Sequence, residues 1–259
     1  MFANLARLVR YRGLISSLVA RELKARYRGS VFGFLWSFIN PLLLLLIYSF
    51  VFTTVMPNKQ PGVEPYALFM FCGILPWTWF ASSLNESAGV LISGGNLIKK
   101  VLFPAEVLPV VTVVANLVHF LFGLPILLLF LAWKGRLGWS ALLLPVPLLI
   151  QLVFTLGLAL FVSALTVHFR DIQNILSHVL HLWFFATPVL YAYPAAGPLH
   201  ALLRLNPMTH VIVAYQEALF YGEFHHARGL ALAALAALLA FAAGSFLFER
   251  LRDTLAEEV

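Results

Sequence analysis

The sequence predicts an all-α polytopic membrane protein with six transmembrane helices, and three observations support this fold class. Of the 259 residues, 61% are hydrophobic and only 11% are charged, whereas soluble globular chains are about 25% charged. The apolar residues form six long blocks, and the charged residues lie in the gaps between them. A helix crosses a hydrocarbon core of about 30 Å with about 20 residues, and its backbone hydrogen bonds are satisfied internally. We therefore expect one membrane domain and no separately folded soluble domain.

Residues 1–30 form a basic region that precedes the first apolar block. Apolar residues such as Leu5, Leu8 and Leu18 recur at helical spacing, while the basic residues lie on another side. This pattern favours an amphipathic helix over about 4–28 that lies along the cytoplasmic membrane surface. The alternative is a plain positive flank for the first crossing. No cleaved signal peptide is expected, because no short apolar region followed by a small-residue cleavage site precedes the first block.

The second region, residues 31–259, holds the six crossings. Arg170 and Asp171 must lie at a turn, because either charge at mid-bilayer costs about 2.5–3.5 kcal/mol. Counting Lys and Arg on the two sides gives 12 against 5, so the positive-inside rule places both termini in the cytoplasm. The expected crossings are 31–56, 66–84, 105–133, 139–167, 172–194 and 228–248.

Two connections are too long for simple turns. In the cytoplasmic connection 85–104, Gly94 and Gly95 break the chain and Asn96 is expected to cap a short exposed helix. On the outer side, prolines interrupt residues 195–224, and the remaining apolar stripe is too short to span the membrane. The second connection is therefore expected to be a periplasmic re-entrant helical hairpin between the fifth and sixth crossings.

Two histidine pairs raise the question of a metal site, and the sequence argues against one. His178 and His181 share a helix face without a neighbouring intramembrane carboxylate, and His225 and His226 adjoin Glu223 in an outer loop. Zinc needs three or four converging ligands. The sequence has a single cysteine, so neither an intrachain disulfide nor a cysteine cluster can form. We expect no metal site.

The sequence also offers no catalytic or fuel-consuming chemistry. The acidic residues are expected at segment ends, so no carboxylate pair or coupling-ion site lies at mid-membrane. The Gly-x-x-x-x-Gly-Lys-Ser/Thr loop that cradles nucleotide phosphates is missing. If this chain supports uphill transport, the energy must come from another polypeptide.

Five motifs in order give the chain a resemblance to a known family. It resembles the permease subunits of ABC exporters for O-antigen, capsule and teichoic-acid polysaccharides (Wzm-like). The motifs occupy 21–41, 96–104 followed by Glu106, 169–172, 187–191 and 206–208. One short motif would be weak evidence, but five in family order on a six-crossing chain are specific.

The resemblance implies a half-channel: two copies pair, and each binds an ABC ATPase subunit on the cytoplasmic side. The cargo would be a polysaccharide on undecaprenyl diphosphate, carried across the inner membrane of a bacterium. ATP and Mg²⁺ would bind the partner ATPase, this chain would bind no cofactor, and nucleic acid would not be a partner. The outer hairpin would correspond to periplasmic gate helices. The residues implied in ATPase coupling are Asn96, Leu97, Ile98, Lys99, Lys100 and Phe103, with Arg170 and Asp171 nearby.

The expected cargo suggests roles for aromatic and basic residues. Aromatic rings would let a sugar chain slide by stacking on its CH faces, although the interfacial belt of Trp and Tyr is an equal alternative. The candidate lining residues are Trp36, Tyr48, Trp77, Trp79, Trp183, Phe184, Tyr191 and Tyr193. The candidates for binding the lipid diphosphate, or anionic headgroups, are Arg21, Lys24, Arg26 and Arg28.

Three alternative functions stay open at this point. An ABC exporter of a drug or small lipid would have the same architecture but a compact substrate pocket. A polytopic lipid-modifying enzyme would need converging catalytic groups, and the sequence indicates none. A scaffold that anchors other subunits would need neither.

Overall fold

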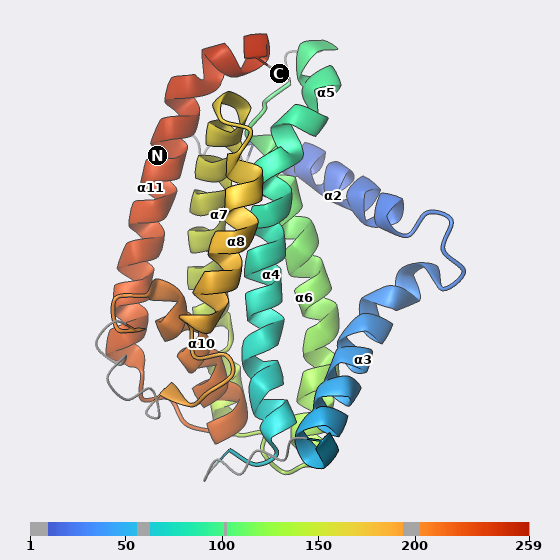
Figure 1. Cartoon of the computed structure of the whole chain (residues 1–259), viewed down its shortest axis with the longest axis vertical. Coiled ribbons are helices and arrows are strands. Elements are labelled where there is room, and N and C mark those ends of the chain that lie inside the picture. The colour runs from blue at the N-terminus through green and yellow to red at the C-terminus, as the bar shows by residue number, and fades with distance from the viewer. Residues whose placement is uncertain (1–9, 56–62, 101–102, 194–202, 259) are drawn as a thin grey trace.

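A computed structural model describes residues 10–55, 63–100, 103–193 and 203–258 of the chain. Within these ranges every regular element is helical. The helices form an elongated bundle, with α2 and α3 on one side of it (Figure 1). This agrees with the predicted all-α class.

Five helices are long and apolar enough to cross a membrane. Three of them match the predicted crossings 31–56, 105–133 and 139–167 to within a few residues. The first of these begins at Trp36 rather than at residue 31. The other two, α4 and α11, are longer than predicted. The bounds are α3 Trp36–Phe50 continued by η2 Val51–Val55, α4 Tyr66–Ser93, α6 Val107–Trp133, η3 Trp139–Leu143 with α7 Pro145–His168, and α11 Ala227–Glu258.

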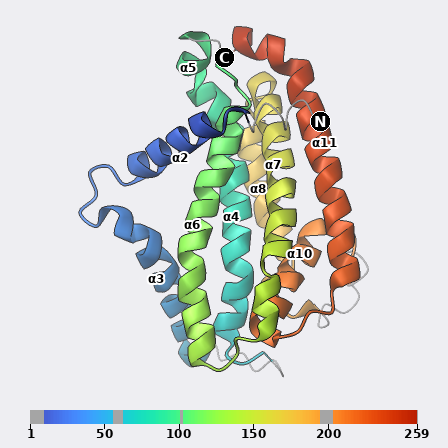
Figure 2. The ribbon, with the colours of Figure 1, turned by 180° about the vertical axis from the view of Figure 1, so that it is seen from behind.

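The helix predicted over 4–28 is present as α2, Arg12–Arg26; residues before Arg10 lie outside the described ranges. The helix lies obliquely across α6 near the end of the bundle that holds the C-terminus (Figure 2). Its buried residues Leu18 and Val19 pack against α6, beside Val107 and Val111. The apolar face of α2 is therefore attached to the bundle.

Helix α4 continues beyond the predicted end at residue 84, because its next residues include neither proline nor paired glycines. As a result Glu86, expected at a segment end, lies inside a spanning helix. Gly94 ends α4, as the glycine pair predicted, and α5 begins directly at Gly95 and extends to Lys100. Asn96 therefore lies within α5, and the prediction that it caps this helix is wrong.

The predicted fifth crossing, 172–194, is not one long helix. α8 spans Ile172–Phe185, and 14 residues rise only about 21 Å. α8 starts beside the end of α7, whereas α10, Pro207–Gln216, lies towards the opposite end, where α11 begins (Figure 1). The described residues thus contain five candidate crossings, and the predicted count of six is not confirmed.

Only part of the predicted outer hairpin, 195–224, falls within the described residues. It consists of α10 and the following π-helical turn η5, Glu217–Tyr221. Every residue from Met208 to Gln216 is buried. This segment packs inside the bundle against α4, α7 and α11, rather than exposing an apolar face.

Helices α7 and α11 form the closest pair in the bundle. A Cβ atom added at Gly157 of α7 would lie within 3.0 Å of the α11 backbone at Ala240 and Phe241, and one at Gly244 would overlap the carbonyl of Gly157. Close backbone approach at small residues is a common way in which membrane helices associate. Glycines therefore fix this pair at short range.

Candidate functional site

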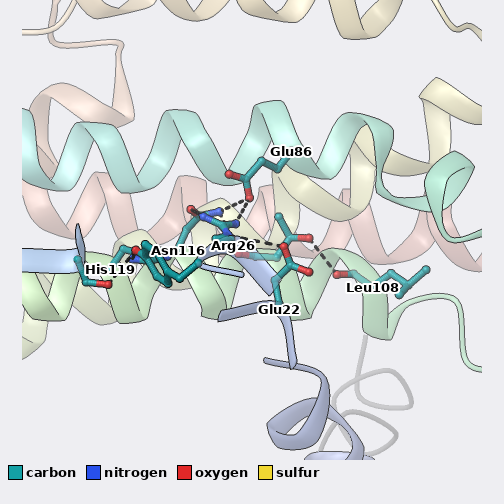
Figure 3. Close-up of polar contacts among 9 residues, drawn as sticks. Glu22, Arg26, Glu86, Leu108, Asn116 and His119 are labelled. Carbon is teal, nitrogen blue, oxygen red and sulfur yellow. Dashed lines mark hydrogen bonds and ion pairs between the residues drawn. The ribbon is translucent and has the colours of Figure 1, made fainter. Parts of the chain in front are cut away.

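A polar cluster ties the surface helix α2 to two spanning helices. The Arg26 guanidinium, at the end of α2, forms an ion pair with the Glu86 carboxylate of α4 through Nη2 (Figure 3). Its Nε lies 3.5 Å from Glu22 Oε1, one turn earlier in α2. Arg26 therefore holds two carboxylates from different helices.

Asn116 of α6 completes this cluster from the bundle side. Its Oδ1 accepts a hydrogen bond from Arg26 Nη1 at 3.1 Å, and its Nδ2 donates to Glu86 Oε2 at 2.7 Å (Figure 3). The side chain is 4% exposed. Because a buried amide is stabilised only when it is hydrogen-bonded, Asn116 fixes the relative positions of the two charged groups.

A second chain of hydrogen bonds runs beside the first. Ser37 Oγ in α3 donates to the Tyr27 hydroxyl at 2.8 Å, and that hydroxyl lies 3.2 Å from His119 Nδ1 in α6. A phenol oxygen carries one proton and two acceptor lone pairs, so the Tyr27 hydroxyl donates to His119 Nδ1 or accepts from it according to the histidine tautomer. The last residues of the α2 segment thus contact three helices.

These contacts border a cavity of about 290 Å³ between α2, α3, α4 and α6. One part of its wall is polar and the remainder is apolar and aromatic. The volume is at the low end of the range for small-ligand pockets. The lining residues are Arg26, Tyr27, Trp36, Ser37, Asn40, Pro41, Leu44, Phe71, Ile74, Leu75, Thr78, Trp79, Ser82, Glu86, Asn116, His119 and Phe120.

Helix α4 presents a polar stripe to this cavity. Thr78, Ser82 and Glu86 recur every four residues and so share one helix face; the stripe is about 12 Å long. Asn40 faces the same cavity from α3. Within the described residues, the side chains of Thr78, Ser82 and Asn40 form no hydrogen bond. Polar groups at membrane depth are costly, and a functional role is the default interpretation.

The four predicted basic residues have different surroundings. Arg21, Lys24 and Arg28 are exposed. Arg26 is only 24% exposed and is engaged with Glu22 and Glu86. Sequence spacing identified the basic face of α2 but not the carboxylate of Glu86, 60 residues away, that binds Arg26.

The predicted aromatic lining divides into three groups. Trp77 and Trp79 are 6% and 2% exposed, so both are buried within the chain, and Trp79 also borders the cavity. Trp36 borders the cavity, and its Nε1 donates to Ser30 Oγ at 3.0 Å. The other members are partly exposed and belong to aromatic clusters or hydrogen bonds within the chain; they are Tyr48, Trp183, Phe184, Tyr191 and Tyr193.

The predicted coupling segments lie at one end of the bundle. Helix α5 and the α7–α8 turn with Arg170 and Asp171 occupy the end that holds the C-terminus (Figure 1). The apolar side of α5 is packed: Ile98 is buried, and Leu97 and Phe103 contact the same hydrophobic cluster as Phe248 of α11.

The polar side of α5 is open to a partner. Lys99 is exposed, as are Arg170 and Asp171 in the neighbouring turn. Asn96 is exposed in the first turn of the helix. The side chain of Lys100 lies outside the described set. At this end of the bundle, charged side chains are therefore exposed, while the apolar side of α5 is packed against the bundle.

At the opposite end, two of the sequence motifs meet through Asn206. Its Oδ1 accepts hydrogen bonds from Met208 N and from Trp183 Nε1, at 3.0 and 2.8 Å. Its Nδ2 donates to Ala186 O and Thr187 Oγ1, each at 2.9 Å. Asn206 thus caps α10 and joins it to the end of α8.

A histidine pair links α10 to the start of α11. His210 Nδ1 and His226 Nε2 are 2.7 Å apart, and His210 Nε2 lies 2.9 Å from the Arg204 carbonyl. Because that carbonyl only accepts, His210 carries its proton on Nε2 and accepts from His226. Burial lowers the pKa of both side chains, and the nearby Glu217 carboxylate partly opposes this effect on the pKa of His226. Gly229 provides the space, since a Cβ there would overlap both rings.

Metal binding finds no support in the geometry of the described residues, among which no three His, Cys, Asp or Glu side chains converge. Cys72 is buried and unpaired. The recognisable sites are thus the cavity beneath α2, the charged end at α5 and the α8–α10 junction.

Together, five long apolar helices, an attached surface helix and a polar cavity at membrane depth define a multi-pass helical membrane protein. The sequence matches the model of the ABC-2 type transporter family over residues 13–220. This chain belongs to that family. The match includes α2, the cavity, α5 and the α8–α10 junction.

Three relatives are similar over most of their length. The chain is 45% identical over 257 residues to the O-antigen export system permease protein RfbA of Myxococcus xanthus, covering 97% of both chains. It is 35% identical to an RfbA of Klebsiella pneumoniae, covering 82% of each. The polysialic acid transport protein KpsM of Escherichia coli is 26% identical over 80% of this chain and 81% of KpsM.

Proposed function

We propose that this chain is the membrane subunit of an ATP-driven exporter that moves a polysaccharide out of the cytoplasm. The 45% identity with an O-antigen export permease along 97% of both chains carries this conclusion. Membership of the ABC-2 type transporter family and the missing nucleotide-binding loop agree with a subunit driven by a separate ATPase. ATP and Mg²⁺ then bind the ATPase, and this chain needs no cofactor.

Two copies of the chain form the conduit in this proposal. The unpaired apolar faces of α3 and α8 support it, because contiguous exposed apolar surface marks membrane or protein contacts. Three of the candidate lining residues belong to these helices and would border the conduit: Tyr48 on α3, and Trp183 and Phe184 on α8. The exposed apolar residues are Leu43, Leu46, Ile47 and Phe50 on α3 and Ile175, Val179, Leu182 and Phe185 on α8.

The proposed membrane frame has six crossings and both termini in the cytoplasm of a bacterial cell. Helix α8 and the residues that follow it to Tyr193 would make the fifth crossing, and α10 with η5 would belong to the outer hairpin. The Lys and Arg distribution supports the orientation, and the α5 end then faces the ATPase. α10 and its preceding segment would act as the outer gate, and the exposed cations Arg21, Lys24 and Arg28 would attract an undecaprenyl-linked diphosphate at the cytoplasmic leaflet.

The test is charge reversal on α5 in cells that depend on this exporter. The double variant Lys99→Glu/Lys100→Glu should abolish surface polysaccharide while the ATPase alone still hydrolyses ATP, because the contact would be electrostatically mismatched. Lys134→Glu, an exposed lysine at the other end of the bundle, is the matched control. Unchanged export by the double variant would overturn the placement of the ATPase contact.

The wider proposal is tested by reconstitution with the cognate ATPase and a lipid-linked polymer. ATP-dependent movement of the polymer into the vesicle lumen of inverted membranes is expected. Failure to move any polymer, with ATP hydrolysis intact and movement of a small lipid instead, would replace the function with small-lipid export.

A further inference from the structure

The cavity beneath α2 carries no net formal charge. Its two ionised lining residues, Arg26 and Glu86, are paired with each other, and Asn116 hydrogen-bonds to both. An acidic ligand would have to compete with Glu86 for the guanidinium and would be repelled by the carboxylate. The electrostatics of this site therefore favour an uncharged ligand.

The cavity also offers hydrogen-bonding groups that the protein itself does not use. The side chains of Thr78, Ser82 and Asn40 line it and have no hydrogen-bond partner among the described residues. Hydroxyl and amide groups both donate and accept. A ligand rich in hydroxyl groups can pair with all three, because Thr78 and Asn40 are exposed and Ser82 is half-buried.

The remaining wall is suited to an apolar ring face. Trp36 lies at one side, and Leu44, Ile74 and Leu75 contribute aliphatic surface. A sugar residue combines hydroxyl edges with apolar CH faces, which matches a wall that is polar along α4 and apolar elsewhere. A phosphate or a carboxylate can accept hydrogen bonds from the polar part but has no apolar face for the remaining wall.

We propose that this cavity is a subsite for neutral sugar residues of the exported polymer. Thr78, Ser82 and Asn40 provide its hydrogen bonds, and the Arg26–Glu86 pair selects against acidic sugars. The inference rests on the proposed function, because it takes the polymer to be the cargo. It adds a site within one protomer, separate from the α3 and α8 faces, and a preference for the charge of the sugar.

The experiment measures protection of a cysteine in the cavity. The full chain with its ATPase is placed in phosphatidylcholine nanodiscs and carries Cys72→Ala, which removes the buried native thiol, together with Leu44→Cys, a lining position that leaves Thr78, Ser82 and Asn40 in place. Maltotriose, a neutral trisaccharide, should slow maleimide labelling about threefold at twice its dissociation constant, since the free fraction falls to about one third. A sialic acid trimer at equal ionic strength should leave the rate unchanged.

Two controls separate the cavity from its surroundings. Ser93→Cys lies exposed at the end of α4, outside the cavity, and should label at one rate with or without sugar. The double variant Glu22→Gln/Glu86→Gln removes both carboxylate partners of Arg26 while keeping an oxygen for its hydrogen bonds, so the acidic trimer should now protect Leu44→Cys. Glu223→Gln at the opposite end should not change the preference.

The outcomes distinguish this proposal from the proposed function. The subsite proposal is overturned if maltotriose gives no protection, even if export of the polymer is intact. It is equally overturned if the acidic trimer protects the cysteine while Glu22 and Glu86 are unchanged. The labelling rate without sugar is also compared between phosphatidylcholine and phosphatidylglycerol nanodiscs. A difference between the two lipids assigns the cavity to a lipid headgroup and overturns the sugar subsite. Loss of polymer export in the reconstituted system overturns the proposed function, whereas sugar protection is measured without transport.

Discussion

Helices α3 and α7 are both apolar and long enough to span a membrane, yet they are held in different ways. α7 buries 12 of its 24 residues and meets the backbone of α11 at Gly157. α3 buries only Ser37 and Leu45 of its 15 residues. The difference teaches that hydropathy locates a spanning helix, whereas small residues and polar partners decide how tightly it is held.

The largest expected effect comes from filling the contact between α7 and α11. Gly244→Ala puts a methyl group against the Gly157 carbonyl, and neither backbone can withdraw without separating the helices. We expect a loss of about 3 kcal/mol or more in the free energy of unfolding, seen as a lower thermal midpoint in detergent.

The matched control is Gly13→Ala in α2, where no atom lies within 4 Å of the added methyl group. Alanine is the better helix former, so stability should be unchanged or slightly higher. If both alanines behaved alike, close glycine packing would not be what distinguishes α7 from α3.

The next effect tests the polar attachment of α2. Asn116→Ala removes two hydrogen bonds to Arg26 and Glu86, which should cost about 1–2 kcal/mol and raise hydrogen exchange in residues 12–26. Asn85→Ala on α4, a side chain without a hydrogen bond among the described residues, should leave exchange in α2 unchanged. Equal exchange in the two variants would contradict the attachment.

A dependence of stability on pH, of intermediate size, tests the contact between α10 and the start of α11. The pKa values of His210 and His226 are lowered in the folded protein by burial. Below the usual pKa of about 6.5, the unfolded chain therefore binds protons that the folded chain does not, and stability falls as the pH decreases from 7 to 5.

The double variant His210→Gln/His226→Gln should flatten this dependence of the thermal midpoint on pH. His225→Gln, whose side chain is 77% exposed, should retain it. A slope in the double variant as steep as in the unaltered chain would show that other groups control the pH response.

The smallest effect is expected on the open face of α3. Ile47 is 53% exposed, so Ile47→Ala should change the stability of one protomer by no more than about 0.5 kcal/mol. Leu45→Ala on the same helix, at a side chain that is 3% exposed, should cost about 2–5 kcal/mol. If Ile47→Ala nevertheless lowers the dimer fraction in light scattering, α3 lies at the seam between copies.

The sequence was informative where the physical cause is local. Apolar length located α6 and α7, and the glycine pair located both the end of α4 and the short charged helix after it. The predicted end of the second crossing, residue 84, is too early, because α4 continues to Ser93. The charge of Glu86 within this helix is accommodated by its contacts with α2 and α6.

Most of the candidate site depends on contacts that no local pattern encodes. Arg26 and Glu86 are 60 residues apart, and Arg26 and Asn116 are 90 apart. One signal was present: Thr78, Ser82 and Glu86 recur every four residues in a predominantly apolar helix. Gly244, within a run of small residues, was a similar unused signal for close packing of α11.

Only Gly94 separates α4 from α5, and this short junction has a mechanical consequence. A Cβ there would overlap Leu108 of α6, so the junction is confined and has no slack loop to absorb motion. Eight residues before Gly94, about 12 Å along the axis of α4, Glu86 is paired with Arg26. We therefore expect a displacement of α5 to move α4 with it, and through Glu86 and Arg26 to move α2 and the walls of the cavity.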